Sequence, residues 1–157
     1  SINREQIKKD LLKNNKQNEY NLSEILFNLD VGGNLNNKYE EIKKSIINQG
    51  FESSALLYSA SDSSSNGGKV GWIKENSLNS KIRKNLINLT TNDFTKPILV
   101  PGGFLILKIN NIRQTNKYKD LNKEIDSVVK TQTSNQLNQF SNLYFNKIRK
   151  DINIDEL

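Results

Sequence analysis

The chain has 157 residues, a formal net charge of +6 and a pI near 9.4. It contains neither cysteine nor histidine, which excludes disulfides, thiolate nucleophiles, and metal sites or general bases built on those residues. We expect no metal and no cofactor. The positive charge does not predict a nucleic-acid partner, because lysines and glutamates alternate, as over residues 38–44, instead of clustering.

The first segment with a helical pattern is short and polar. Between Asn3 and Asn15, a narrow apolar stripe consists of Ile7, Leu11 and Leu12, and lysines cover the remaining positions. A helix this short is marginal without packing. No apolar run in the chain approaches the ~20 residues of a membrane-spanning helix, and no signal-peptide pattern is visible.

The middle of the chain alternates between strand-like and helix-like patterns. Gly50 predicts a helix end, and Pro101-Gly102-Gly103 predicts a tight hairpin. The elements we predict are a strand at 20–27, helices at 36–49 and 51–58, a polar loop at 59–68, a strand at 70–73, a helix at 80–89, and strands at 97–100 and 104–112.

The C-terminal part predicts one long helix, from Tyr118 to about Lys150. Apolar residues recur there at three- and four-residue steps: Leu121, Ile125, Val128, Leu137, Phe140, Tyr144 and Ile148. The pattern is too polar for a core helix, so we expect this helix to pack on another element. The tail from Asp151 to Leu157 alternates weakly and is compatible with an edge strand.

Three motifs in this order resemble the parvulin family of prolyl isomerases. They are Tyr20 to Leu26 (YNLSEIL), Gly67 to Trp72 (GGKVGW), and Lys96-Pro97-Ile98 followed by Gly103 to Ile109 (GFLILKI). Within the family the chain resembles the SurA-type periplasmic chaperones, whose parvulin domains are followed by helices. The resemblance implies an α+β fold, a parvulin-like four-stranded antiparallel sheet with surrounding helices, plus flanking N- and C-terminal helices.

The same resemblance implies that the chain is divided into three parts. Residues 1–18 would be an N-terminal helix of a chaperone-type module, 19–113 the parvulin-like domain, and 114–157 the C-terminal long helix and tail. A periplasmic location is implied as well.

The family's apolar proline cup maps onto Val70, Leu78 and Ile82, and Leu105 stands beside it as a further substrate-binding candidate. Ile82 occupies a position where an aromatic residue is common in the family, which predicts a looser cup. A plain core role for these residues remains the alternative.

The family's polar catalytic network is largely replaced. Its two histidines fall on Glu24 and Leu105, and its loop cysteine or aspartate falls on Ser61, with Asp62 one place further along. The hydroxyl near the hairpin falls within residues 100–102, which offer none. A buried carboxylate at Glu24 would be costly unless it is paired or protonated, and a partly exposed Glu24 is the alternative.

These observations leave three functional hypotheses. The first is a chaperone domain that binds unfolded outer-membrane protein segments containing proline or aromatic residues, with isomerase activity weak or lost. The second is an active isomerase that uses Asp62, Ser61 and Glu24 in place of the family histidines. The third is an interaction module whose long helix pairs with another chain.

Overall fold

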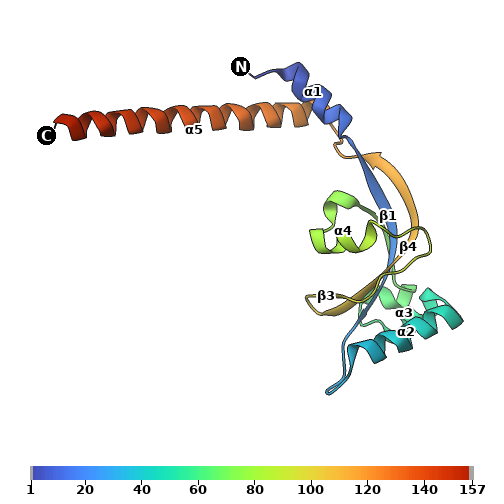
Figure 1. Ribbon diagram of the computed structural model, residues 1–157. Coiled ribbons are helices and arrows are strands. Elements are labelled where there is room, and N and C mark those ends of the chain that lie inside the picture. Colours follow the sequence, from blue (N-terminus) through green and yellow to red (C-terminus); the bar gives the residue numbers. More distant parts are fainter. Residues whose placement is uncertain (1, 156–157) are drawn as a thin grey trace. The chain divides into compact units, whose positions relative to one another are not determined.

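The computed structural model describes residues 2–155, with side chains up to residue 150 (Figure 1). Contacts divide the chain into two compact units. Residues 17–115 form one, here called the sheet unit. The segments up to residue 16 and from residue 116 onward form the other, here called the helical unit.

The sheet unit has an α+β fold. Its elements, in chain order, are β1 (Lys16–Phe27), α2 (Leu35–Gln49), α3 (Phe51–Tyr58), the 3-10 helix η1 (Asp62–Asn66), β2 (Lys69–Lys74), the 3-10 helix η2 (Glu75–Ser77), α4 (Ser80–Leu86), β3 (Ile98–Val100) and β4 (Gly103–Asn116).

The four strands form one antiparallel sheet in the order β2-β1-β4-β3. β1 and β2 pair from Glu19 opposite Lys74, and a bulge between Leu22 and Ser23 shifts their register. β3 and β4 pair with Val100 opposite Gly103, so that the Pro101-Gly102 turn closes the predicted hairpin. The predicted fold class, including the flanking helices, is confirmed.

Each face of the sheet carries its own apolar core, because alternate residues of a strand point to opposite faces. Leu105 and Leu107 of β4 belong to the first core, which α4 covers through Leu86. Ile106 belongs to the second core. The helices α2 and α3 cover that second core through Ile42, Ile46, Phe51 and Ala55.

Several element boundaries differ from the sequence prediction. β1 begins at Lys16 and β4 runs to Asn116, because polar residues continue the sheet ladder beyond the apolar stretches. The polar loop contains η1, and α4 ends at Leu86.

The helical unit consists of α1 (Arg4–Lys13) and α5 (Leu121–Asp155). These helices contact each other, and Ile7 and Ile125 are both buried. Arg4 pairs with Asp126 at 2.6 Å, and the Asn15 side chain accepts a hydrogen bond from the backbone N–H of Tyr118 at 2.9 Å.

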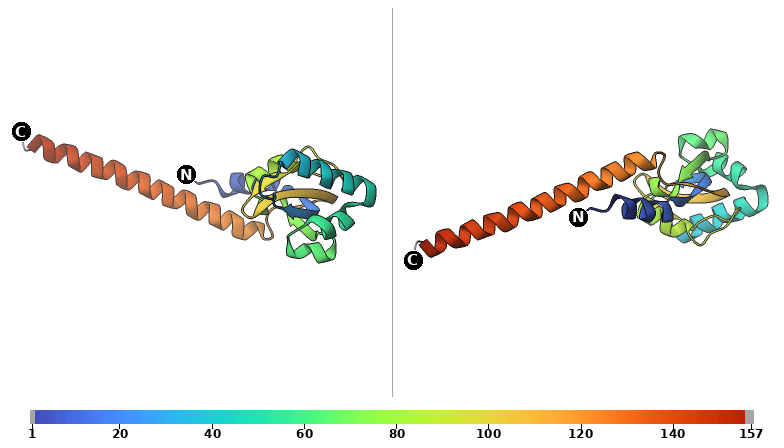
Figure 2. Two further views of the ribbon diagram at one scale, coloured as in Figure 1. Left: turned by 90° about the horizontal axis from the view of Figure 1, so that it is seen from below. Right: turned by 90° about the horizontal axis from the view of Figure 1, so that it is seen from above.

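α5 is one continuous helix (Figure 2). The edge strand proposed for its C-terminal tail is wrong over residues 151–155, which are helical, whereas residues 156–157 lie outside the described residues. Helix propagation adds one hydrogen bond per residue, so that a weakly alternating polar tail can simply extend the helix before it. Over the range 2–155, no helix is both long enough and apolar enough to cross a membrane.

Candidate functional site

The candidate site begins where the double-glycine turn packs against β1. Gly67 and Gly68 both have positive φ, at 67° and 77°. The carbonyl of Gly68 accepts a hydrogen bond from the Glu24 N–H at 2.8 Å. A Cβ atom on Gly68 would lie 2.3 Å from the Glu24 carbonyl oxygen. Only glycine allows this approach, and it places the serine-rich loop beside Glu24.

Glu24, Ser61 and Ser63 form what we call the Glu24–serine cluster. The Glu24 carboxylate is half-buried and accepts hydrogen bonds from Ser61 Oγ at 2.5 Å and Ser63 Oγ at 2.8 Å. The two hydroxyl oxygens lie 3.2 Å apart. The carboxylate is therefore satisfied by two hydroxyl donors, which offsets the cost of removing it partly from water.

The loop is held along β1 by further hydrogen bonds. Ser59 Oγ accepts from the Leu26 N–H at 3.0 Å, and the Leu26 carbonyl accepts from the Ala60 N–H at 2.6 Å. Ser61 is the N-cap of η1 and accepts from the Ser63 N–H through its side chain. The cap turns the next serine back toward Glu24.

Two of the predicted catalytic positions, Glu24 and Ser61, are thus brought into direct contact. Asp62 is exposed, and over residues 2–155 its carboxylate takes part in no hydrogen bond or ion pair. Ser63 was missed by the sequence reasoning. Its signal was the Ser-Asp-Ser spacing, which is typical of a serine cap on a short turn.

The four residues predicted to bind substrate differ in their burial. Leu78 and Ile82 are partly buried and pack against the first core, of which Leu105 is a buried member. Val70 is 42% exposed and does not belong to that core. Three of the four predicted substrate-binding residues therefore share one apolar surface.

Hydrogen bonds hold α4, which carries Ile82, in place over this surface. Asn79 Oδ1 caps the helix by accepting from the Ile82 N–H at 2.9 Å. Arg83 donates to the Leu78 carbonyl at 2.9 Å, and Lys81 Nζ donates to the Leu99 carbonyl of β3 at 2.6 Å.

The cluster and the cup lie on the same face of the sheet. Leu26 packs against the first core. Because residues two apart on a strand point to the same face, Glu24 points to that face as well. A polar group and an apolar surface on one side of a sheet suit an extended polypeptide, whose amides and side chains need both.

A second charged group joins three strands. Arg113 Nε donates to the Glu19 carboxylate at 2.9 Å, and its guanidinium lies 3.9 Å from the centre of the Trp72 ring. The hydrogen bond from Arg113 lowers the pKa of Glu19. This group links β1, β4 and β2 and has a structural role. Among the described residues, no group of three acidic side chains is placed to hold a metal ion.

Comparison with known proteins decides which family this arrangement represents. The rotamase family model, described as the PPIC-type PPIASE domain, matches residues 25–111, more than half of the chain. The chain belongs to the PpiC-type rotamase family. The match confirms the parvulin resemblance. The matched range includes the predicted substrate-binding residues Val70, Leu78, Ile82 and Leu105 and begins one residue after Glu24.

The relatives of this rotamase chain include SurA chaperones. Chaperone SurA of Pseudomonas putida is 32% identical over 111 residues, which cover 66% of this chain and 26% of that protein. SurA of Escherichia coli is 30% identical over 112 residues, covering 67% of this chain and 26% of that protein. The chain thus spans about a quarter of the length of these curated relatives.

Solved structures share the rotamase fold. A PpiC-type peptidyl-prolyl cis-trans isomerase domain superposes with a TM-score of 0.55 at 21% identity, covering 65% of this chain and 97% of that one. A SurA-like chaperone of Campylobacter jejuni gives a TM-score of 0.53 at 16% identity and covers 88% of this chain and 62% of that one. At these identities the likeness concerns the fold alone.

Proposed function

We propose that this rotamase domain binds segments of unfolded polypeptide as part of a SurA-like periplasmic chaperone, and that its isomerase activity is weak or lost. The proposal rests on one observation: the partly buried apolar side chains of Leu78 and Ile82 lie on the same face of the sheet as a polar cluster whose protons are already engaged. The clients would be extended segments of outer-membrane proteins that contain proline or aromatic residues, as the family resemblance implies.

The binding half of the proposal is supported by the cup. Leu78 and Ile82 are partly exposed on a surface held by a capped helix, so that a proline ring could bury apolar area without reorganising the site. Ile82 is smaller than the aromatic residue common at this position, which would weaken binding rather than abolish it.

The proposal that catalysis is weak is supported by the number of hydrogen-bond donors in the Glu24–serine cluster. Rotation about an X-Pro bond breaks amide resonance and leaves a nitrogen lone pair that a hydrogen-bond donor can stabilise. A serine hydroxyl has one proton, and a carboxylate has none. Ser61 and Ser63 both donate their protons within the cluster. The cluster can therefore accept a hydrogen bond from a substrate, but it has no proton left to donate to the substrate amide. Leu105 offers no polar atom.

An active isomerase is the second candidate, and it is favoured by the exposed Asp62 carboxylate, which takes part in no hydrogen bond or ion pair over residues 2–155. A carboxylate that gains a proton would become a donor, and Asp62 could swing toward the amide when a substrate binds. This candidate predicts a strong dependence of activity on Asp62.

We also propose that the flanking helices belong to a chaperone-type module, with the division of the chain close to 1–18, 19–113 and 114–157. The supporting observation is a set of exposed apolar side chains on α5: Leu137, Phe140, Leu143, Tyr144 and Phe145. If this face instead pairs two copies of the chain, light scattering would give a dimer, and a strict monomer at high concentration would count against that pairing.

A titration of the 15N-labelled chain with a short proline-containing peptide tests the binding proposal. We expect the largest amide shifts at Leu78 and Ile82, with a smaller change at Val70. Ile82→Ala should weaken binding several-fold, whereas Ile87→Ala, at the exposed C-cap position of α4, should leave it unchanged. Shifts confined to the opposite face of the sheet would contradict the proposal.

A further inference from the structure

A cleft separate from the cup opens between α2 and the segment that precedes β3. Its volume is about 410 Å³, which is within the range of ligand sites. The residues that line it include Tyr39 and Lys43 from α2, Leu89 after α4, and Phe94 and Lys96 from the segment before β3. It shares no residue with the cup or with the Glu24–serine cluster.

The floor of the cleft is apolar and partly aromatic. Tyr39 and Phe94 are partly buried against the second core, and Leu89 is partly buried against the first. The cleft therefore lies where the two cores approach each other around one edge of the sheet. Binding to such a floor is favourable for an apolar group, which gains roughly 25 cal/mol per Å² of buried apolar area. A small inorganic ion has no apolar area to bury and would gain nothing from this contact.

Two lysines from different elements line the cleft. Within residues 2–155, neither Lys43 nor Lys96 is part of an ion pair. The nearby carboxylate of Asp93 is engaged locally, since it accepts hydrogen bonds from the Thr90 N–H at 2.9 Å and Thr90 Oγ1 at 3.0 Å. Lys43 Nζ lies 6.0 Å from the centre of the Tyr39 ring, so its ammonium group already stands over the floor of the cleft. Both ammonium groups can pair with a carboxylate ligand there.

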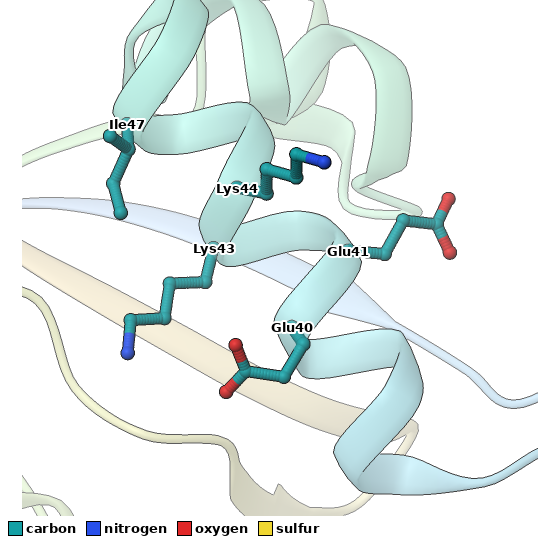
Figure 3. Close-up of a pocket in the computed structure, with 5 residues that line it drawn as sticks. All are labelled: Glu40, Glu41, Lys43, Lys44 and Ile47. Atoms are coloured by element: carbon teal, nitrogen blue, oxygen red, sulfur yellow. The ribbon is translucent and has the colours of Figure 1, made fainter.

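The surroundings of Lys43 limit the kind of anion. Lys43 also borders a neighbouring hollow with Glu40, Glu41, Lys44 and Ile47 (Figure 3). In Figure 3 Lys43 and Ile47 project from one side of α2, whereas Glu41 projects from the other. Glu40, one helical turn before Lys43, would repel a polyanion such as nucleic acid. An isolated carboxylate next to an apolar side chain fits better.

We propose that this cleft is a second docking site for polypeptide, and that it takes an aromatic side chain flanked by an acidic residue. The ring would lie on the floor formed by Tyr39, Phe94 and Leu89, and the carboxylate would lie between Lys43 and Lys96. The Tyr39 phenol has an ordinary pKa near 10, and burial raises this pKa further. The phenol is therefore protonated at pH 7 with or without burial and can donate a hydrogen bond to the same carboxylate. The site does not depend on isomerase activity or on binding at the cup.

Three peptides test the site, each titrated into the full 15N-labelled chain at low salt. The first, Ac-Gly-Glu-Phe-Glu-Gly-NH2, carries both features. The second replaces both glutamates with glutamine, and the third replaces the phenylalanine with glycine. We expect the first peptide to shift the amides of Tyr39, Lys43, Phe94 and Lys96, and the other two to bind about tenfold more weakly.

The matched variants separate a built site from general charge attraction. Lys43→Gln combined with Lys96→Gln should weaken the first peptide about tenfold, whereas Lys9→Gln combined with Lys84→Gln, which removes the same charge at exposed positions, should not. The first double variant should still bind the proline peptide at the cup. Equal losses in both double variants, equal binding of the three peptides, or no shift at the cleft would each overturn the proposal.

Discussion

The hydroxyl of Ser61 donates a hydrogen bond of 2.5 Å to the carboxylate of Glu24, which lies 37 positions earlier in the chain. This contact fastens the serine-rich loop to β1 at a position onto which the family resemblance maps a histidine. A carboxylate only accepts hydrogen bonds, whereas an imidazole can both donate and accept them. The same contact therefore supports the fold of the loop and limits the chemistry available to a bound amide.

Removing the acceptor at Glu24 should destabilise the domain. In Glu24→Leu the hydroxyls of Ser61 and Ser63 lose their acceptor, and we expect the free energy of unfolding to fall by about 1–3 kcal/mol in urea denaturation. Glu24→Gln keeps an acceptor oxygen and should lose less. Asp62→Leu is the matched control at an exposed position and should change stability by no more than about 0.5 kcal/mol. Similar losses at Glu24 and Asp62 would contradict the cluster.

Gly68→Ala should be far more harmful than Gly32→Ala. Both glycines have nearly the same φ, 77° and 76°, but a Cβ on Gly68 would lie 2.3 Å from the Glu24 carbonyl oxygen, whereas one on Gly32 would meet nothing within 4 Å. The loss of stability in Gly32→Ala therefore comes from backbone strain alone and should be about 1–2 kcal/mol. Thermal or chemical denaturation should give at least twice that loss for Gly68→Ala. Equal losses would mean that the close approach to β1 contributes nothing.

The ion pair between Arg113 and Glu19 should make stability depend on pH. Because the hydrogen bond from Arg113 lowers the pKa of Glu19 in the folded state, this stabilisation is present above the unfolded pKa and is lost as pH falls through the folded value. We expect Arg113→Gln to be less stable than the wild type at pH 7, and the difference to shrink between about pH 5 and pH 2.

Part of the stability difference between the wild type and Arg113→Gln should persist in acid. This part measures the contact of the Arg113 guanidinium with Trp72, since the contact does not require the Glu19 charge. Denaturation curves of both proteins across this pH range check both parts. A stability difference that stays constant down to the lowest pH would contradict the assigned role of Glu19.

Asp62→Ala distinguishes the two catalytic proposals. The Asp62 side chain is exposed and has no hydrogen-bond partner over residues 2–155. If isomerase activity is weak or lost, its removal should leave any residual rate within about twofold of the wild type. The active-isomerase alternative predicts that the rate falls to the background. Ser65→Ala, also exposed in the same loop, is the control for an effect of the loop alone.

Much of the sheet unit could be predicted, because its strands and helices carry strong apolar patterns and its turns carry glycine and proline. The GGKVGW and GFLILKI motifs placed the turn, the hairpin and the family. The periodicity of α5 predicted a helix, but its polar tail carried no strong pattern, and the edge strand expected there is helical over residues 151–155. Local patterns decide an element only where burial enforces them.

The site was less predictable, because it depends on contacts between distant residues. The positions of Glu24 and Ser61 could be predicted from their distance to the family motifs. The role of Ser63 could not, because the cap that turns this residue toward Glu24 depends on loop geometry. Val70 is exposed on the edge strand β2 and lies outside the first core, so its place in the cup stays a prediction. The cleft lined by Lys43 and Lys96 joins residues 53 positions apart (96 − 43) and has no local sequence signal.

We propose that the cup is retained while catalysis is relaxed, and a prolyl-isomerase assay tests this most directly. The rate of cis-trans exchange of a proline peptide should be measured for the full chain beside an active PpiC-type isomerase domain, at a peptide concentration where NMR shows the cup to be occupied. We predict a rate enhancement at least tenfold below that of the active domain, which corresponds to about 1.4 kcal/mol less transition-state stabilisation. A comparable enhancement would contradict it.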